Sequence, residues 1–503
     1  MSTQAANPRI LIVTPEVTSL PPGMGNLSNY FSVKAGGVAD VSASLIKALF
    51  EQGVDVHVAL PDYRKIFNQK LPPILRRELD ILRNEFPDDR IHLAKDRGFF
   101  YLDSISYGAG SENTKIAVTF QREVLNNIVP RVQPDLIHCN DWMTGLIPAV
   151  SRKSGIRCLF TIHNIHTSKC SLLYMEDIGI DASFFWQNLF YDHYPLSYAQ
   201  SRESNPVDFL ASGVFSAHFV NTVSPTFLME MIEGRHTWIG QHLRQELANK
   251  WESGCAVGIL NAPDPSFNPM TDEGLFLKFS AKDHHEAKRI NKLFLQEKLG
   301  LIADADAPVF FWPSRLDTFQ KGCQLVAEIL DRIIGEYWDK HLQIVFVANG
   351  EFKKKFKDIV SLHQLQKRVA ICDFDEQLAR LSYGASDFVL MPSLFEPCGL
   401  PQMIGPLYGA LPVVSDTGGL HDTVTQMDIE KDTGNGFLFK DYNAEGLFEA
   451  TNEAMRFYDL PREYKTRQIQ RVIKESLASF NHGVTASKYT KLYEKMLQRP
   501  LIN

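Results

Sequence analysis

The chain has 503 residues, of which 44% are hydrophobic and 22% are charged, and its formal net charge is −7. At roughly 150 residues per domain, this length predicts two to four globular domains. The acidic balance argues against a nucleic-acid binder, which usually carries a basic face. No basic segment followed by an apolar stretch opens the chain, and no apolar run approaches the ~20 residues that span a membrane.

Cysteine usage points to a reducing compartment. The seven cysteines are scattered, and no two of them form a CxxC pair. We therefore expect reduced thiols and a cytoplasmic protein.

In the first half of the chain, short apolar runs alternate with longer amphipathic stretches such as Val41–Glu51. Continuous runs of Val, Ile and Leu are typical of strands buried on both faces, so the pattern predicts a parallel α/β sheet. The predicted strands are Arg9–Val17, Asp55–Asp62, Pro134–Asp141, Arg157–Asn164 and Ala217–Ser224.

A second series follows a segment rich in Pro and Asn, Gly258–Pro269, which is a candidate linker. Its predicted strands are Ala307–Asp317, Leu342–Gly350, Arg368–Phe374, Asp387–Ser393 and Leu411–Asp416. We expect two doubly wound domains, residues 1–262 and 270–478, facing a central cleft at the carboxyl ends of their strands. The tail, residues 479–503, has helical periodicity and is expected to pack back on the N-terminal domain.

The stretch Lys34–Val41, "KAGGVADV", places two glycines just before a predicted helix. Two interpretations stay open. The glycines either form only a tight turn, or Gly36 and Gly37 allow an anion to approach the free N–H groups of the helix. In the second case Lys34 adds a positive charge.

The stretch Pro313–Gly322, "PSRLDTFQKG", ends an apolar strand with an arginine and a lysine. Arg315 and Lys321 suit a diphosphate, the arginine through its planar fork and the lysine as a point charge. Surface salt bridges beside a turn are the alternative.

The most specific stretch is Met391–Leu420. The carboxylate of Glu396 follows a strand, and Pro397 lacks an N–H. The next three residues offer successive amides at a helix start, which can bind sugar hydroxyls or phosphate oxygens. A second glycine-rich turn, Asp416–Leu420, opens another helix. Two such turns beside an Arg/Lys pair indicate a ligand site more than packing.

Polar residues also end two strands of the first series, in His138–Trp142 and Thr161–Asn164. Two interpretations stay open: these residues either only satisfy hydrogen bonds within the fold, or they form a site at the edge of the sheet. No HExxH or Cys/His metal spacing occurs in the sequence, so we expect no metal.

Taken together, these motifs resemble those of bacterial glycogen synthases and plant starch synthases, which are retaining glucosyltransferases with two Rossmann-like domains (GT-B architecture). The resemblance extends from Arg9 to Leu497. Its most specific elements are "FEPCGL" and "TGGLHDTV" in that order, together with "KAGGVADV", "IHCNDW", "TIHN" and "SRLDTFQKG".

The resemblance implies roles for individual residues. Arg315 and Lys321 hold the donor's diphosphate, Lys34 approaches its phosphate with Gly36 and Gly37, and Glu396 lies beside the transferred glucose. His163 and Asp141 lie beside the reacting sugar. The remaining donor contacts are the base-stacking Phe374, the amides of Cys398, Gly399 and Leu400, and Thr417 with Gly418 at the diphosphate.

The sequence departs from the family pattern in places. The spacing from Arg315 to Lys321 is one residue longer than usual, so a bulge must realign the lysine. Residues Ala262 and Pro263 alter the hinge motif, the continuation after His163 differs, and Thr18–Val33 is an insertion.

We therefore predict a cytoplasmic glucosyltransferase that moves glucose from ADP-glucose to the non-reducing end of an α-1,4-glucan, with retention and without a metal or other cofactor. Neither nucleic acid nor membrane is an expected partner. Two alternatives remain open: a related transferase that uses UDP-glucose or a small acceptor, and a non-catalytic glucan-binding relative.

Overall fold

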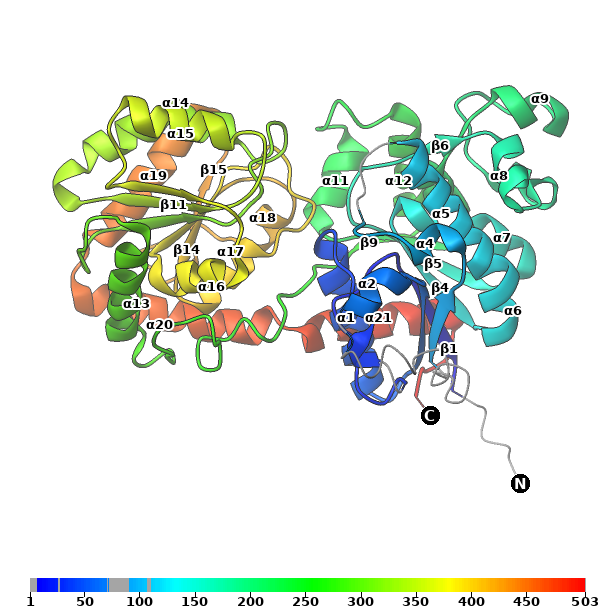
Figure 1. Cartoon of the computed structure of the whole chain (residues 1–503), viewed down its shortest axis with the longest axis horizontal. Coiled ribbons are helices and arrows are strands. Elements are labelled where there is room, and N and C mark those ends of the chain that lie inside the picture. The colour runs from blue at the N-terminus through cyan, green and yellow to red at the C-terminus, as the bar shows by residue number, and fades with distance from the viewer. Residues whose placement is uncertain (1–6, 26–27, 70, 72–89, 106–109, 503) are drawn as a thin grey trace. The chain divides into compact units, whose positions relative to one another are not determined.

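The computed structural model describes residues 7–25, 28–69, 71, 90–105 and 110–502 (Figure 1). The chain forms two compact units. Unit 1 comprises Met1–Leu260 and His482–Asn503, and unit 2 comprises Asn261–Asn481. The first boundary lies after residue 260. The candidate linker belongs in part to unit 2, where Arg380 donates to the carbonyl of Ser266 (3.1 Å) and lies over the ring of Phe267.

Unit 1 contains a parallel sheet of seven described strands in the order β3-β2-β1-β4-β5-β8-β9. Its central strands are fully buried because helices cover both faces (Figure 1). The order reverses between β1 and β4, and ligands of such sheets bind at this kind of switch point. The strands are β1 (Arg9–Val13), β2 (Asp55–Pro61), β3 (Ile91–Ala94), β4 (Leu136–Asn140), β5 (Arg157–Ile162), β8 (Phe219–Thr222) and β9 (Ala256–Gly258).

The other elements of unit 1 connect these strands. A short antiparallel pair is formed by β6 (Lys169–Cys170) and β7 (Val207–Asp208). The longer helices are α1 (Gly37–Glu51), α5 (Ser111–Glu123), α7 (Ile147–Ser154), α10 (Phe209–Ser216), α11 (Pro225–Glu233), α12 (Gln241–Glu252) and α21 (His482–Leu497). The shorter ones are α2 (Arg64–Gln69), α4 (Arg97–Phe100), α6 (Val129–Val132), α8 (Leu172–Ile178) and α9 (Tyr198–Ser204).

The described part of the insertion Thr18–Val33 is packed into unit 1. At its base Val17 and Val33 exchange backbone hydrogen bonds of 3.1 and 2.7 Å. Its apolar side chains Met24 and Phe31 are about 1% exposed, and the ring of Phe31 packs edge-on against Phe67. Burial of these side chains holds the insertion against unit 1.

The C-terminal helix α21 is part of unit 1 and packs against α1 (Figure 1). The buried imidazole of His138 links it to the sheet. The hydroxyl of Thr161 donates to Asn221, so the Thr161 oxygen accepts from His138 Nε2 (2.6 Å). His138 Nδ1 must then accept the hydroxyl hydrogen of Tyr493 (2.7 Å).

Unit 2 contains a second parallel sheet, in the order β12-β11-β10-β13-β14-β15. Apolar side chains form a core on each of its faces. The order reverses between β10 and β13. The strands are β10 (Val309–Trp312), β11 (Gln343–Val347), β12 (Val369–Cys372), β13 (Phe388–Met391), β14 (Leu411–Ser415) and β15 (Phe437–Phe439).

Helices cover both faces of this sheet as well (Figure 1). They are α13 (His284–Leu299), α14 (Cys323–Glu336), α15 (Lys353–Leu362), α16 (Glu376–Ala385), α17 (Pro401–Leu407), α18 (Gly418–Thr423), α19 (Ala444–Tyr458) and α20 (Arg462–Ser479). The expected α/β class with two Rossmann-like domains is confirmed. None of the described helices is long and apolar enough to cross a membrane.

Candidate functional site

In unit 1, polar side chains follow the three adjacent strands β1, β4 and β5 at their carboxyl ends. The carboxylate of Glu16, which comes shortly after β1, is fully buried. It accepts hydrogen bonds from the amides of Ala35 (2.5 Å) and Gly36 (3.1 Å). Glu16 therefore fixes the glycine-rich turn against the edge of the sheet.

The two glycines of this turn are not required by the packing of the protein. Gly36 has an extended φ of −151°, and Gly37 has no positive φ. A Cβ built on Gly37 would meet no atom of the described residues within 4 Å. Open space in front of the first turn of α1 is what close approach of a ligand needs.

Lys34 stands beside this turn and is half exposed. Its Nζ lies 2.7 Å from Asp40 Oδ2, in the first turn of α1. The predicted phosphate-binding lysine is thus paired with a carboxylate in this structure, and an arriving phosphate would compete with Asp40 for it.

Asp141 follows β4 in an uncommon backbone conformation, with φ 63°. Its Oδ1 accepts from the amide of His163 (3.4 Å). Burial raises the pKa of Asp141 to about 7, although the amides of Asn164, His163 and Trp142 oppose the rise and Glu16 adds to it. The carboxyl group is therefore poised to change charge near neutral pH.

His163 follows β5, and its tautomer can be deduced. Asn140 donates through Nδ2 to the carbonyl of Val13 (3.1 Å), so Asn140 Oδ1 accepts from His163 Nε2 (2.9 Å). The hydrogen then sits on Nε2, and Nδ1 keeps an acceptor lone pair. Burial lowers the pKa of His163 to about 4, so the ring is neutral at neutral pH.

In unit 2, Lys321 and Glu396 form a nearly buried ion pair at the switch point. Nζ lies 2.5 Å from Oε2, and the side chains are 12% and 7% exposed. Ser393, which follows β13, donates to the same oxygen (3.1 Å). The structure thus brings together two predicted residues that are 75 positions apart in the chain.

A turn built on Asp317 connects Arg315 to Lys321. Asp317 Oδ1 accepts from the amides of Phe319 (2.9 Å) and Gln320 (2.6 Å). Burial alone would raise the pKa of Asp317, but these amides and the nearby cations Arg315 and Lys321 lower it. The chain between Arg315 and Lys321 is therefore held in a turn by Asp317.

Gly322 closes that turn with φ +70°, and a Cβ there would lie 1.8 Å from the carbonyl oxygen of Pro392. Glycine is therefore obligatory at this position. Arg315 stands free beside the turn: it is exposed, and no carboxylate of the described residues lies within ion-pair distance of it.

The loop Glu396–Leu400 and the turn at Thr417 lie against each other. The amide of Gly419 donates to the carbonyl of Glu396 (2.9 Å), and a Cβ on Gly419 would lie 2.0 Å from the carbonyl oxygen of Cys398. Gly399 has φ +72°, and Gln402 holds the carbonyls of Cys398 and Gly399.

This packing orders two helix starts side by side. Leu400 precedes α17, and Thr417 with Gly418 starts α18. Among the described residues the amides of Cys398, Gly399 and Leu400 donate no hydrogen bond to the protein. Amides held in this way can bind an anion or sugar oxygens.

Phe374 follows β12 and is 58% exposed. Its amide donates to Asn349 Oδ1 (3.1 Å), which fixes the backbone beneath an exposed ring. Such a ring can stack on a flat ligand group. The neighbouring Asp373 pairs with Lys353.

The described residues contain no group of three or more His, Cys, Asp and Glu side chains suited to a metal ion. The cationic groups of unit 2 can instead neutralise a diphosphate. The chemistry available is electrostatic: a cationic strand edge in unit 2, and a carboxyl with a neutral imidazole in unit 1.

Three positioning residues were missed by sequence reasoning: Glu16, Asn140 and Ser393. Each is one of the last two residues of a predicted strand. Their place at strand ends was a usable signal, but the residue that each would contact was not readable from sequence.

Comparison with protein families gives two matches. Residues 9–248 match the starch synthase catalytic domain, and residues 307–456 match the glycosyl transferases group 1 family. The first match contains the strand-end residues of unit 1 described above, and the second contains those of unit 2.

Similar proteins cover almost the whole chain. A glycogen synthase of Alkaliphilus metalliredigens is 33% identical over 92% of this chain and 97% of its own length. One of Clostridium perfringens is 33% identical over 93% of this chain and 96% of its own length. Among solved structures, the catalytic domain of Arabidopsis thaliana starch synthase IV is similar, with a TM-score of 0.76, 25% identity and coverage of 98% of this chain and 100% of that one.

Proposed function

Because the chain belongs to the family of bacterial glycogen synthases and starch synthases, we propose that it transfers glucose from ADP-glucose to the non-reducing end of an α-1,4-glucan, with retention. The chain is a glycosyltransferase. The observation that carries the residue assignment is the buried Lys321–Glu396 pair beside the unpaired Arg315. The similar Arabidopsis structure is bound to ADP and acarbose, which supports an adenine nucleotide donor and a glucan acceptor.

The donor's diphosphate is the leaving group, and negative charge grows on it as the bond to glucose breaks. Arg315 and Lys321 neutralise that charge, together with the amides at the starts of α17 and α18. These groups are already held in place, so little reorganisation is needed when the bond breaks. Lys34 adds a further positive charge when it leaves Asp40.

In this proposal Glu396 acts on the transferred glucose. Because Lys321 and Ser393 both contact Oε2, its position is fixed before the donor arrives. A carboxylate held there accepts hydrogen bonds from glucose hydroxyls and balances positive charge on the sugar. It acts by positioning and electrostatics and not as a nucleophile.

The groups of unit 1 act on the sugar. The neutral imidazole of His163 offers the Nδ1 lone pair to a hydroxyl hydrogen, since Nε2 is engaged by Asn140. Asp141, once ionised, places a negative charge near the oxocarbenium-like sugar. Exclusion of water from the reacting groups protects the donor from hydrolysis.

A transfer assay tests the proposal. Purified protein is incubated with ADP-glucose or UDP-glucose and an α-1,4-glucan, and nucleotide release and chain extension are measured. We expect extension with ADP-glucose, and a loss of about 10²–10³ in rate for Arg315→Ala. Arg332→Ala is the matched control, because Arg332 lies on α14 of the same unit and forms an exposed ion pair with Glu445 on α19. Equal rates for both folded variants would refute the assignment of Arg315.

A further inference from the structure

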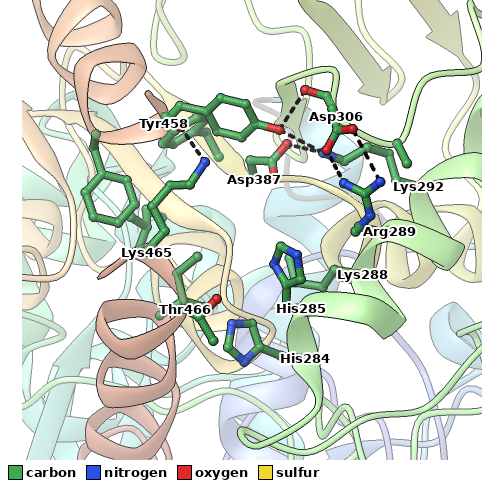
Figure 2. Close-up of a pocket in the computed structure, with 15 residues that line it drawn as sticks. His284, His285, Lys288, Arg289, Lys292, Asp306, Asp387, Tyr458, Lys465 and Thr466 are labelled. Carbon is green, nitrogen blue, oxygen red and sulfur yellow. Dashed lines mark hydrogen bonds and ion pairs between the residues drawn. The ribbon is translucent and has the colours of Figure 1, made fainter. Parts of the chain in front are cut away.

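A small basic cavity lies in unit 2 at the edge of the sheet where β13 and β14 begin. It has a volume of about 80 Å³ and is bordered by α13 and α20 (Figure 2). Arg315, Lys321 and Glu396 follow the ends of parallel strands, so the cavity is at the opposite edge from them. None of the predicted donor residues lines it.

Positive charge exceeds negative charge among the residues that line this cavity. The cations are Lys288, Arg289, Lys292 and Lys465, and the carboxylates are Asp306 and Asp387, in addition to His284 and His285 (Figure 2). Arg289 pairs with Asp306, and Lys292 with Asp387 (2.7 Å). Two lysines remain without a carboxylate of their own.

The first of these, Lys288, is fully enclosed. Its Nζ donates to the carbonyls of Ser386 (2.7 Å), Tyr408 (2.9 Å) and Gly384 (3.3 Å). Burial lowers its pKa to about 7, with Lys292 acting in the same direction and Asp387 against it. Carbonyl dipoles satisfy its donors but leave a net charge beside the cavity.

The second, Lys465, reaches across from α20. Its Nζ donates to the carbonyl of Tyr458 (2.5 Å) and lies over the ring of that residue. Burial lowers the pKa of Lys465 as well. A lysine has three donors, so two remain for another acceptor.

Two histidine nitrogens in this cavity have no hydrogen-bond partner among the described residues. His284 is 1% exposed, and its Nδ1 donates to the carbonyl of Ala281 (2.9 Å). Its Nε2 is therefore a buried lone pair without a donor, whereas Nε2 of His285 makes no hydrogen bond but lies 3.8 Å from Glu286 Oε1. A buried polar atom of this kind calls for a bound group.

We propose that this α13–α20 cavity binds a tetrahedral oxyanion, the phosphate group of inorganic phosphate or of a small organic phosphate. At ~10–15 Å³ per water, the cavity has room for several waters, which is sufficient for one such anion. On binding, protonated His284 donates from Nε2, Lys465 supplies its remaining donors, and Thr466 offers a hydroxyl. The anion neutralises the charge that Lys288 brings to this place.

Calorimetry on the full chain tests the proposal, with inorganic phosphate, sulfate and glycerol 3-phosphate as separate probes at constant ionic strength. We expect one phosphate per chain in this cavity, and affinity weakened about tenfold or more in Lys465→Met, the loss expected for one charge-assisted hydrogen bond. His285→Gln should weaken binding in the same direction. Glycerol 3-phosphate binding as tightly as phosphate would identify organic phosphates as ligands; much weaker binding would restrict the site to the free anion.

Two variants serve as controls. Lys474→Met changes an exposed lysine on the same helix, α20, and should leave phosphate affinity unchanged. Arg315→Ala removes a proposed donor contact and should also leave it unchanged, so binding at the donor residues is recognised separately. The proposal is overturned if the wild-type protein binds no phosphate, or if Lys465→Met binds it as well as Lys474→Met.

Sulfate binding at different pH values tests protonation of the two histidines, because the charge of sulfate is constant between about pH 5 and pH 8. Burial lowers the pKa of His284 to about 4 and lowers that of His285 as well, and a bound anion raises both, so we expect tighter sulfate binding at about pH 5 than at about pH 8. Lys288, whose pKa is lowered to about 7, changes in the same direction. The other charged groups that face these imidazoles are Arg289, Lys292, Asp306, Asp387, Lys465, Glu286 and Arg462. Tyr458 stays neutral. Affinity independent of pH would contradict protonation of His284 and His285.

Discussion

Variants of the Lys321–Glu396 ion pair can separate its contribution to stability from its contribution to glucosyl transfer. Removing either partner alone leaves the other charge in a site where the two side chains are only 12% and 7% exposed. For buried pairs this costs about 3–5 kcal/mol. For a domain of this size, 1 kcal/mol corresponds to a shift of about 2–4 °C in melting temperature. Lys321→Met and Glu396→Gln should therefore each lower the melting temperature of unit 2 by about 6–20 °C.

The double variant should behave differently in the two assays. Replacing both partners by neutral groups of similar volume is often nearly neutral for stability, and Ser393 can still donate to a glutamine at position 396. We expect the melting temperature of the double variant to return to within a few degrees of wild type. Glucosyl transfer should stay about 10²–10³ below wild type, because the missing charge no longer stabilises the diphosphate.

Calorimetric melting and initial-rate assays with ADP-glucose measure both quantities on the same samples. Lys340→Met is the control: it breaks an ion pair with Asp459 that is largely exposed, and such pairs contribute about 0–1 kcal/mol. Recovery of transfer together with stability in the double variant would show that the pair only supports the fold. Failure of stability to recover would refute the attribution to an uncompensated buried charge.

Three further predictions concern unit 1. Asp141→Asn should reduce transfer and abolish its rise through about pH 7. Because the folded pKa of Asp141 is raised, its stability contribution is lost as pH rises, so this variant should also melt higher than wild type at about pH 8; an unchanged pH profile would contradict the assignment. Tyr493→Phe leaves His138 Nδ1 without a donor and should cost about 1–3 kcal/mol in unfolding experiments, while transfer at ambient temperature is retained. Gly37→Ala should melt like wild type yet lose about tenfold or more in transfer, and normal kinetics would show that no ligand approaches there.

Most of the sheet architecture was predictable from sequence. Apolar runs such as Leu342–Gly350 are long and β-branched, and strands were found inside all ten predicted ranges. The strands β3, β9 and β15 were missed, as were the two-residue strands β6 and β7.

The candidate site residues were predicted from a simple rule. They follow strands, and the carboxyl ends of parallel strands meet at one edge of the sheet. That rule led to His163, Asp141, Arg315 and Glu396. It did not predict that Lys34 would pair with Asp40, because helix position and side-chain direction decide that contact.

The amino-acid sequence alone determined the alternation of strand and helix, the two series of strands and the glycine-rich turns, since each depends on neighbours within a few residues. Tertiary structure alone decided which distant groups meet: Lys321 with Glu396, Tyr493 with His138, and Lys465 with the histidines of α13. The physical reason is that burial and charge pairing depend on three-dimensional neighbours. The sequence pattern shows which side chains follow a strand, but not which distant group forms an ion pair or hydrogen bond with each of them.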